Sequence, residues 1–310
     1  MQYFIVDSLN LAYRAHNANL KLKTSTGLYS GMFFGFVRTL LSLKKKYRGY
    51  KFIVVWDSKP VAKYALQPDY KAGRASLPST VVSHQIDDIK SFLSHSGVDQ
   101  YSMRDEEADD IIATLTETFK KEGAGTILLY SNDKDMLQLV ENGKVVVFKP
   151  KVGLSPKKFY DEEAVVQQFG VSPKKLAIYR SLDGDSSDNI TGVSRISRKI
   201  IARLVTATDS VESFYMALEG ESLTEFQKRS FEEARSRVVV NEKIVTLNRD
   251  LRGLVLESSQ IDGAHIVDLF KRYEIRSMDP VVVADLFGSS LNIRYTEARP
   301  SVKIESYSLF

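Results

Sequence analysis

The 310-residue sequence contains no cysteine, only four histidines and no long hydrophobic run. The absence of cysteine excludes disulfide bonds, thiolate zinc sites and cysteine nucleophiles, and it is compatible with a reducing compartment. The N-terminal sequence MQYFIVDS carries an apolar run that is too short for a signal peptide or a bilayer span. We therefore expect a cytoplasmic protein with no membrane partner.

Hydrophobic residues make up 43% of the chain and charged residues 26%, so the chain can bury one large core or two smaller ones. The net charge of +4 says little about partners by itself. Basic residues nevertheless form local runs, which can contact phosphates but are also common on ordinary solvated surfaces. The runs are Lys44, Lys45, Lys46 and Arg48; Lys149, Lys151, Lys157 and Lys158; and Arg195, Arg198, Lys199 and Arg203.

Three short apolar segments, at residues 3–6, 52–56 and 126–130, predict β-strands. Their apolar residues are continuous rather than alternating, which is typical of strands buried on both faces of a parallel sheet. Stretches with helical periodicity lie between them, at residues 32–47, 81–95 and 108–121. This order predicts an α/β, doubly wound fold with a mainly parallel central sheet.

Residues 58–79 carry Pro60, Pro68 and Pro78 together with basic and aromatic residues, and they fit neither a core helix nor a core strand. After Pro150 the strand signals fade, and helical segments are expected at 161–170, 173–181 and 197–207 and over most of 212–273. We therefore predict an α/β unit over residues 1–150, with an excursion at about 58–80, and a helical region over residues 151–310.

Acidic residues follow each of the three predicted strands. Asp7 follows the first strand, Asp57 the second, and Asp133 and Asp135 the third. Because the carboxyl ends of parallel strands border one crevice, we expect these acids to converge. Converging carboxylates repel one another, and a hard divalent cation with oxygen ligands is the usual compensation. No histidine joins the set, which favours magnesium or manganese over zinc.

Two further acidic groups could border the same crevice. Glu107, Asp109 and Asp110 begin the helix predicted at residues 108–121, where acids also simply complement the helix dipole. Asp185 and Asp188 lie in LDGDSSDNI, where acids also cap turns before helices. Taken with the acids that follow the strands, all these carboxylates predict a metal site.

Six segments, found in the order VDSLNLAYRA, VVWDSK, DYKAGR, EEADDIIATL, SNDKDMLQLV and LDGDSSDNITGV, resemble the 5′ nuclease family. That family includes phage 5′ exonucleases, the 5′ nuclease domain of bacterial DNA polymerase I, and flap endonucleases. The resemblance spans roughly residues 3–205. It implies a PIN-like nuclease core with a helical arch, followed by a helical region that contains a helix-hairpin-helix-like element.

The resemblance also implies roles for individual residues. One Mg²⁺ ion would be held by Asp7, Asp57, Glu107 and Asp109, and a second by Asp133, Asp135, Asp185 and Asp188, with Asp110 in or near the shared shell and Mn²⁺ as a substitute metal. Lys71 and Arg74 in the arch, together with Arg14, resemble the basic side chains that contact the scissile phosphate. Tyr70 resembles a residue that stacks on a nucleobase. Lys71 and Arg74 would share one face if their segment were helical.

The sequence departs from the family pattern after GDSSDNI. The family usually continues with a glycine-rich hairpin that binds a duplex phosphate, commonly through a potassium ion, whereas Arg195 and Ser197 replace the two later glycines here. This departure argues against the potassium site. Arg195, Arg198 and Lys199 would instead contact nucleic acid directly. Ser8, where many members have glycine, is a tolerable change.

The expected function is a structure-selective 5′ to 3′ exonuclease and flap endonuclease acting on 5′-ended or branched DNA, or on RNA primers in RNA-DNA hybrids, in replication or repair. The chain length leaves no room for a polymerase domain, so we expect a free-standing monomer, as among phage members. The C-terminal ESYSLF resembles a sliding-clamp-binding tail, although an ordinary terminus is the plainer interpretation. Two alternatives stay open, a PIN-type ribonuclease and a DNA-junction binding module without catalysis.

Overall fold

The computed structural model describes residues 1–72, 80–151, 157–257 and 259–287. The strands of its central sheet are β1 (Gln2–Asp7), β2 (Tyr50–Val55), β3 (Asp99–Ser102), β4 (Ile127–Tyr130), β5 (Val145–Lys149), β6 (Lys158–Tyr160) and β9 (Val255–Glu257). They lie in the order β6-β5-β4-β1-β2-β3-β9. The five inner strands are parallel, and the edge strands β6 and β9 are antiparallel to their neighbours.

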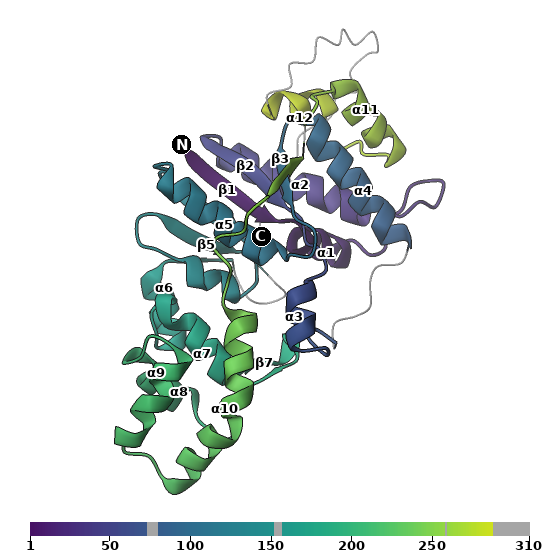
Figure 1. Cartoon of the computed structure of the whole chain (residues 1–310). Helices are drawn as coiled ribbons and strands as arrows, with labels where there is room; N and C mark the ends of the chain where they lie inside the picture. The colour runs from purple at the N-terminus through teal and green to yellow at the C-terminus, as the bar shows by residue number, and fades with distance from the viewer. Residues whose placement is uncertain (73–79, 152–156, 258, 288–310) are drawn as a thin grey trace.

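Helices cover both faces of this sheet (Figure 1). Along β1, Phe4 and Val6 pack in one core while Tyr3 and Ile5 pack in the other, so successive side chains of the strand enter opposite cores. This arrangement explains why the strand sequences are continuously apolar. The predicted α/β, doubly wound fold with a mainly parallel sheet is confirmed.

The Phe4 face is covered by α1 (Ser8–Ala18), α2 (Gly31–Lys46), α4 (Thr80–His95), α11 (Gly263–Arg272) and α12 (Pro280–Leu286). The Tyr3 face is covered first by α5 (Ala108–Lys121) and η1 (Asp135–Leu139). Helices α11 and α12 are distant in sequence from the first strands but pack in the same core. No helix within the described ranges is long and apolar enough to cross a bilayer.

A helical lobe extends from the Tyr3 face, at the bottom of Figure 1. It contains α6 (Glu162–Phe169), η2 (Pro173–Lys175), α7 (Leu176–Asp183), α8 (Arg198–Thr206), α9 (Val211–Ala217), η4 (Leu218–Gly220) and α10 (Glu225–Val245). Between α7 and α8 lie β7 (Gly184–Asp185), η3 (Ser186–Asp188) and β8 (Ile190–Thr191). A Cβ atom on Gly184 would lie 2.4 Å from the Gly192 nitrogen, so this crossing requires glycine.

The chain does not stay helical after residue 150. Strands β6 and β9 both lie beyond that point, yet both belong to the central sheet, and β9 pairs with β3. Strand β9 was missed because Val255 and Leu256 are half-exposed on a three-residue edge strand, which leaves no periodic burial pattern in the sequence. The segment from 212 to 273 is therefore only partly helical.

The excursion after β2 contains one short helix, α3 (Val61–Leu66), with no buried residue. Lys71 has φ +57 and lies in a turn, so the helical segment on which it would share a face with Arg74 does not include Lys71. The backbone amide of Lys71 instead donates to the Asp188 carbonyl, at 3.0 Å, which fixes the turn against η3. Arg74, the other predicted base of this segment, lies outside the described residues.

Candidate metal centre and nucleic-acid interface

The carboxyl edge of the central sheet gathers the acids that follow its strands. Asp7 is the last residue of β1, and β1 pairs in parallel with both β2 and β4, which Asp57 and Asp133 follow. The Ser131 hydroxyl donates to Asp7 Oδ2 at 2.8 Å, and the Ala108 amide donates to Asp57 Oδ1 at 2.8 Å. The segment after β4 therefore orients the Asp7 carboxylate, and the start of α5 orients the Asp57 carboxylate.

Burial and neighbouring carboxylates raise the pKa of two acids in this group, Asp7 and Asp109. Burial raises the pKa of Asp7 to about 7, and the carboxylates of Asp57 and Asp133 act in the same direction, against hydrogen bonds that favour the charged form. Burial, Asp133 and Asp7 also raise the pKa of Asp109 well above its ordinary value. A raised pKa means that the ionised form of these carboxylates is destabilised, and a bound cation would stabilise that form.

Glu107, at the start of α5, is neutralised by two lysines. Lys63 Nζ lies 2.7 Å from Glu107 Oε2, Lys71 forms an ion pair with Oε1, and the Tyr70 hydroxyl donates to Oε2 at 3.2 Å. Burial by itself would raise the pKa of Glu107, but the two ammonium groups hold it below its ordinary value. The base of the excursion therefore reaches directly into the acid cluster.

Asp110 has a different set of contacts from the other acids of this segment. Its Oδ2 lies 2.8 Å from Lys63 Nζ, and its Oδ1 accepts from the Asn248 amide at 2.7 Å. Both oxygens are thus occupied by protein groups, and the side chain is buried. These contacts favour a structural role, in which Asp110 ties Lys63 and the segment after α10 to α5.

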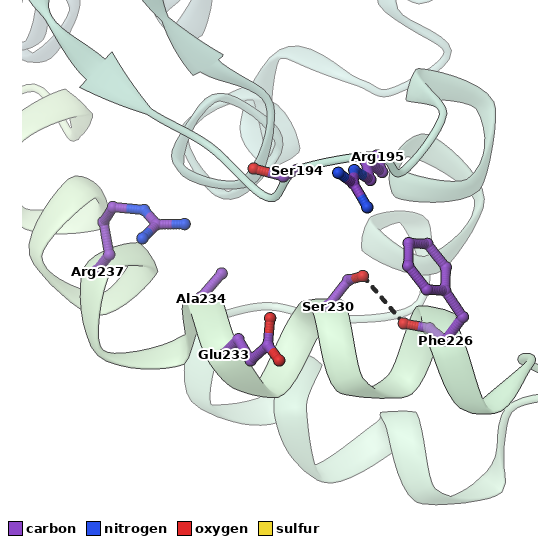
Figure 2. A pocket seen from close by; sticks show the side chains of 7 residues that line it. All are labelled: Ser194, Arg195, Phe226, Ser230, Glu233, Ala234 and Arg237. Atoms are coloured by element: carbon purple, nitrogen blue, oxygen red, sulfur yellow. Dashed lines mark hydrogen bonds between the residues drawn. The ribbon is translucent and has the colours of Figure 1, made fainter.

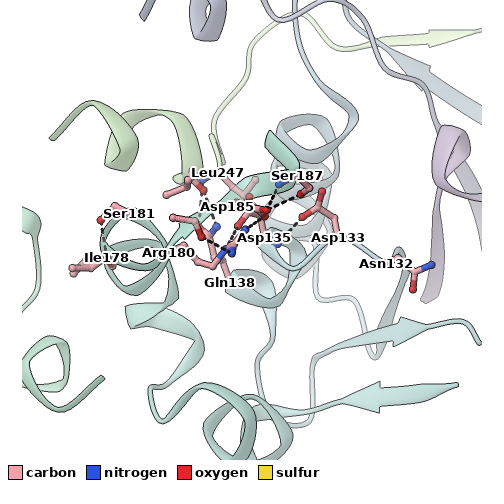
Figure 3. A network of polar contacts seen from close by, with 12 residues as sticks. Asn132, Asp133, Asp135, Gln138, Ile178, Arg180, Ser181, Asp185, Ser187 and Leu247 are labelled. Atoms are coloured by element: carbon pink, nitrogen blue, oxygen red, sulfur yellow. Dashed lines mark hydrogen bonds and ion pairs between the residues drawn. The ribbon is translucent and has the colours of Figure 1, made fainter. Parts of the chain in front are cut away.

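A second group of acids surrounds a buried arginine (Figure 3). Arg180, on α7, is only 2% exposed; its Nε lies 3.0 Å from Asp135 Oδ1, and its Nη2 forms an ion pair with Asp185. Burial and the Asp133 carboxylate raise the pKa of Asp135 to about 7, although Arg180 opposes that rise. Burial would also raise the pKa of Asp185, but hydrogen bonds from Ser187 and Arg180 lower it to about 2.

Lys63 and Arg180 were not predicted as site residues. Lys63 falls in the excursion, where no pattern marked it. Arg180 occupies a buried position in the helix predicted at 173–181, and a charged residue within an apolar helical pattern was the available signal.

Asn189 links the excursion to the loop that carries Asp185 and Asp188. Its Nδ2 donates to both the carbonyl and the carboxylate of Asp69 at 2.9 Å, and its own carbonyl accepts from Gln67 Nε2 at 2.7 Å. Asn189 has φ +59, a conformation that asparagine tolerates better than most residues. We call Gln67, Asp69 and Asn189 the latch; it fixes the position of Lys71, two residues beyond Asp69.

Breaking the latch should slow cleavage without unfolding the protein. Asn189→Gly keeps access to positive φ but removes the two side-chain hydrogen bonds, each worth about 1 kcal/mol. We expect kcat on a 5′-flap substrate to fall about tenfold, the equivalent of 1.4 kcal/mol, because Lys71 is less well positioned. Asn142→Gly, which removes an exposed side-chain contact with Glu162, is the matched control. Unchanged kcat in Asn189→Gly would show that the latch does not position Lys71.

Arg14 and Tyr70 have partners that their predicted roles did not include. Arg14 Nη1 donates to the Tyr130 hydroxyl at 2.7 Å, and its Nε donates to the Lys151 carbonyl at 3.2 Å. Tyr70 is 4% exposed and packs with Ile190 and α10 residues, so its ring is not open to a base in this conformation. Arg14 lies beside the carboxyl end of β4, where a phosphate contact stays a prediction.

Residues 192–197, between β8 and α8, correspond to the hairpin of the family and are called the hairpin below; with the start of α8 they carry the predicted nucleic-acid contacts. Arg195 has φ +61, so it adopts the conformation expected of the glycine it replaces. Arg195, Arg198 and Lys199 are exposed, and Arg198 Nε lies 2.8 Å from Asp183 Oδ1. The three basic side chains therefore lie on an accessible surface of the helical lobe.

Within the described part of the chain, no three acidic or histidine side chains are arranged tightly enough to hold a metal ion. Lysine and arginine side chains provide the compensating charge instead, at Glu107 and at Asp135 and Asp185. The structure thus brings the predicted acids to one edge of the sheet, while their division between two metal ions stays a prediction.

Comparison with protein families identifies the chain. Residues 2–170 match the family model described as 5′-3′ exonuclease, N-terminal resolvase-like domain, and residues 171–264 match 5′-3′ exonuclease, C-terminal SAM fold. The chain belongs to the 5′-3′ exonuclease family. The predicted family is confirmed, and the two matches together span residues 2–264.

Relatives within the 5′-3′ exonuclease family differ in length. A 5′-3′ exonuclease of Aquifex aeolicus is 32% identical over 249 residues, which cover 80% of this chain and 82% of that protein. DNA polymerase I of Bacillus subtilis is 30% identical over 247 residues, which cover 79% of this chain but 28% of the polymerase. The chain thus spans less than a third of that polymerase.

Solved structures share the fold at lower identity. The bacteriophage T5 flap endonuclease, in a complex with DNA and metal ions, has a TM-score of 0.66 and 19% identity, covering 92% of this chain and 100% of that chain. Human GEN1, in a complex with Holliday junction DNA, has a TM-score of 0.60 and 14% identity, covering 91% of this chain and 71% of that chain. These likenesses support the PIN-like core followed by a helical lobe.

Proposed function

We propose that this 5′-3′ exonuclease is structure-selective and hydrolyses phosphodiester bonds near 5′ ends, as an exonuclease and flap endonuclease acting on DNA or RNA primers. The observation that carries the proposal is that the strand-end carboxylates and Glu107 surround Asp109, and that Lys71 of the excursion pairs with Glu107. A carboxylate cluster supplies metal ligands, and a neighbouring lysine ammonium group supplies phosphate recognition. Junction-bound and flap-type relatives of the same fold support the structure selectivity.

The residues present suit divalent cations by their chemistry, and the side chains would have to draw closer together around an ion than they lie in the described structure. All donors are carboxylate oxygens, as Mg²⁺ and Mn²⁺ prefer, and burial with mutual repulsion leaves Asp7, Asp109 and Asp135 in need of positive charge. Asp7, Asp57, Glu107 and Asp109 would hold one ion, and Asp133, Asp135, Asp185 and Asp188 the other. Bound ions would activate water and stabilise the leaving 3′ oxygen, so that the products carry a 5′ phosphate and a 3′ hydroxyl.

The chain's own residues then account for positioning. Lys71 is paired with Glu107 in this structure, and it becomes available to a phosphate oxygen once Glu107 has another partner. Arg180 lies at Asp135 and Asp185 and would limit the negative charge there. Ser131 and the Ala108 amide hold Asp7 and Asp57 in fixed orientations, which reduces the reorganisation needed for catalysis.

Cleavage of a 5′-labelled flap tests the proposed function. We expect cutting near the branch in Mg²⁺ or Mn²⁺, with none in EDTA, because the carboxylates cannot bind phosphate without cations. DNA and RNA flaps measured side by side would report the preferred sugar. Binding of the junction without cleavage in either metal would favour the alternative of a non-catalytic binding module, and selective cutting of single-stranded RNA would favour the PIN-type ribonuclease.

We also propose that the hairpin binds no potassium ion. Arg237, on α10, donates to the carbonyl oxygens of Thr191 and Gly192 at 3.0 and 3.1 Å, and Arg195 occupies a position where the family has glycine. Carbonyl groups that already accept from a guanidinium have less capacity for an ion. We expect equal cleavage rates in sodium and in potassium at the same ionic strength, and a marked potassium requirement would contradict this expectation.

The remaining features are also proposals. We propose a cytoplasmic, monomeric protein that removes RNA primers or flaps, and both a bacterial 5′-3′ exonuclease and a phage flap endonuclease are among the proteins that it resembles. The clamp-binding tail, ESYSLF, lies outside the described residues. Deletion of residues 305–310 should abolish binding to a sliding clamp if the tail carries it, whereas unchanged clamp binding would remove that proposal.

A further inference from the structure

A cleft of about 540 Å³ separates the hairpin from one face of α10 (Figure 2). The helix contributes Phe226, Ser230, Glu233 and Arg237, whose spacing of three or four residues places them on one face. The hairpin contributes Ser194 and Arg195, and Ala234 completes the lining. None of these residues belongs to the acid cluster at the edge of the sheet.

One end of the cleft is closed by hydrogen bonds. Arg237 donates to the carbonyls of Thr191 and Gly192, and Asn241 Nδ2 donates to the carbonyls of Ser181 and Thr191 at 2.9 and 3.0 Å. These bonds fasten the hairpin to α10 at a fixed separation. The cleft is therefore part of the folded lobe and does not require an induced opening.

The other end exposes an aromatic ring and an unpaired cation. Phe226 is 50% exposed, although a phenylalanine ring gains stability by burial. Arg195 extends toward Phe226 (Figure 2) and forms no ion pair with any residue that the structure describes. Its φ of +61 is unfavourable for an arginine. The hairpin thus keeps a strained backbone that presents this guanidinium beside an exposed ring.

The chemistry of the cleft suits one nucleotide. The Phe226 ring offers a face on which an unstacked base can lie, and Arg195 offers donors to a phosphate. Glu233, on the helical floor, accepts hydrogen bonds only, so it disfavours a phosphate there and leaves that space to a base with an amino group. A base inside a duplex is already stacked, which makes an unpaired strand the better ligand.

We propose that the cleft between α10 and the hairpin binds a nucleotide of an unpaired strand, with its base on Phe226 and its phosphate on Arg195. The inference rests on the proposed function only for the class of ligand, which is nucleic acid. It adds a single-strand contact in the helical lobe, outside the acid cluster. A structure-selective nuclease would use such a contact to distinguish a branched substrate from a continuous duplex.

Fluorescence anisotropy of the full chain in EDTA tests this proposal. The probes are a duplex with an unpaired ten-nucleotide strand and the same duplex with blunt ends. Phe226→Ala should weaken binding of the first probe about tenfold and leave the second unchanged, and Phe226→Trp should restore affinity. On the first probe, Arg195→Gly should reduce the slope of log affinity against log salt by about 0.7, because one phosphate contact to the single strand is lost. The same change should not lower Tm, because glycine suits this backbone conformation.

Arg235→Ala is the matched control, because Arg235 lies on α10 but contacts Tyr215 and Glu232 on another face. It should leave the preference between the two probes unchanged. The proposal would be overturned if Phe226→Ala bound each probe as tightly as the unmodified protein does. It would also be overturned if Phe226→Ala lost the same affinity for both probes. Flap cleavage in Mg²⁺ is measured separately, so a protein that binds but does not cut contradicts the proposed function and not this inference.

Discussion

Asp135→Asn is expected to lower the rate of 5′-flap cleavage at least about a thousandfold, equivalent to about 4 kcal/mol of transition-state stabilisation. Asp135 is buried between Asp133 and Arg180, where its pKa is raised to about 7, and the amide removes the charge that a divalent ion requires. The substitution keeps the size of the side chain and an oxygen for Arg180. Folding and junction binding in EDTA should therefore persist.

Single-turnover cleavage with saturating protein measures this effect separately from product release. Asp87→Asn, at an exposed position on α4, removes an equal charge away from the acid cluster and should cut at the normal rate. A rate for Asp135→Asn within tenfold of normal would show that this carboxylate is not a metal ligand. Loss of the folded state, detected by circular dichroism, would instead assign Asp135 a structural role.

Arg180→Leu is expected to destabilise the fold by about 3–5 kcal/mol in EDTA, because it leaves buried carboxylates without their cation. Arg180 is 2% exposed and pairs with Asp135 and Asp185. Mg²⁺ should recover part of the lost stability, since an ion bound at these carboxylates supplies the missing charge. Urea unfolding with and without Mg²⁺ measures both effects.

The matched control is Arg203→Leu, which breaks an exposed ion pair with Glu221 and should cost at most about 1 kcal/mol. Combining Arg180→Leu with Asp135→Asn should cost less than the sum of the two single changes, because the double variant has one fewer unpaired charge. If the losses in free energy of unfolding were additive and Mg²⁺ had no effect on stability, Arg180 would not be compensating the charge of these carboxylates.

The sequence predicted three of the buried strands of the sheet. β1, β2 and β4 are apolar on both faces, so their composition alone identified them, and their parallel order placed the acids that follow them together. Strand β5 has the same apolar composition as these three but was not among the predicted strands. Strands β3, β6 and β9 escaped prediction because they are short and carry polar or exposed residues. Only backbone pairing between distant segments defines such strands, and a local pattern does not contain it.

The acidic residues of the site could be predicted from the sequence, but the lysine and arginine side chains that pair with them were harder to predict. A carboxylate after a buried strand is a local signal, whereas the partners of Glu107 and Asp135 come from α3 and α7. Lys63 and Arg180 reach the acids through tertiary packing, so their sequence context does not reveal them. The same reason explains Tyr70, whose buried hydroxyl contact with Glu107 depends on the packing of the excursion against α10.

Anomalous diffraction from crystals grown with Mn²⁺ tests the metal centre most directly. We expect two anomalous peaks about 4 Å apart at the carboxyl edge of the central sheet, between Asp7 and Asp135, with Lys71 released from Glu107. Peaks elsewhere, or no bound manganese at concentrations that support cleavage, would contradict a carboxylate-held pair of catalytic ions.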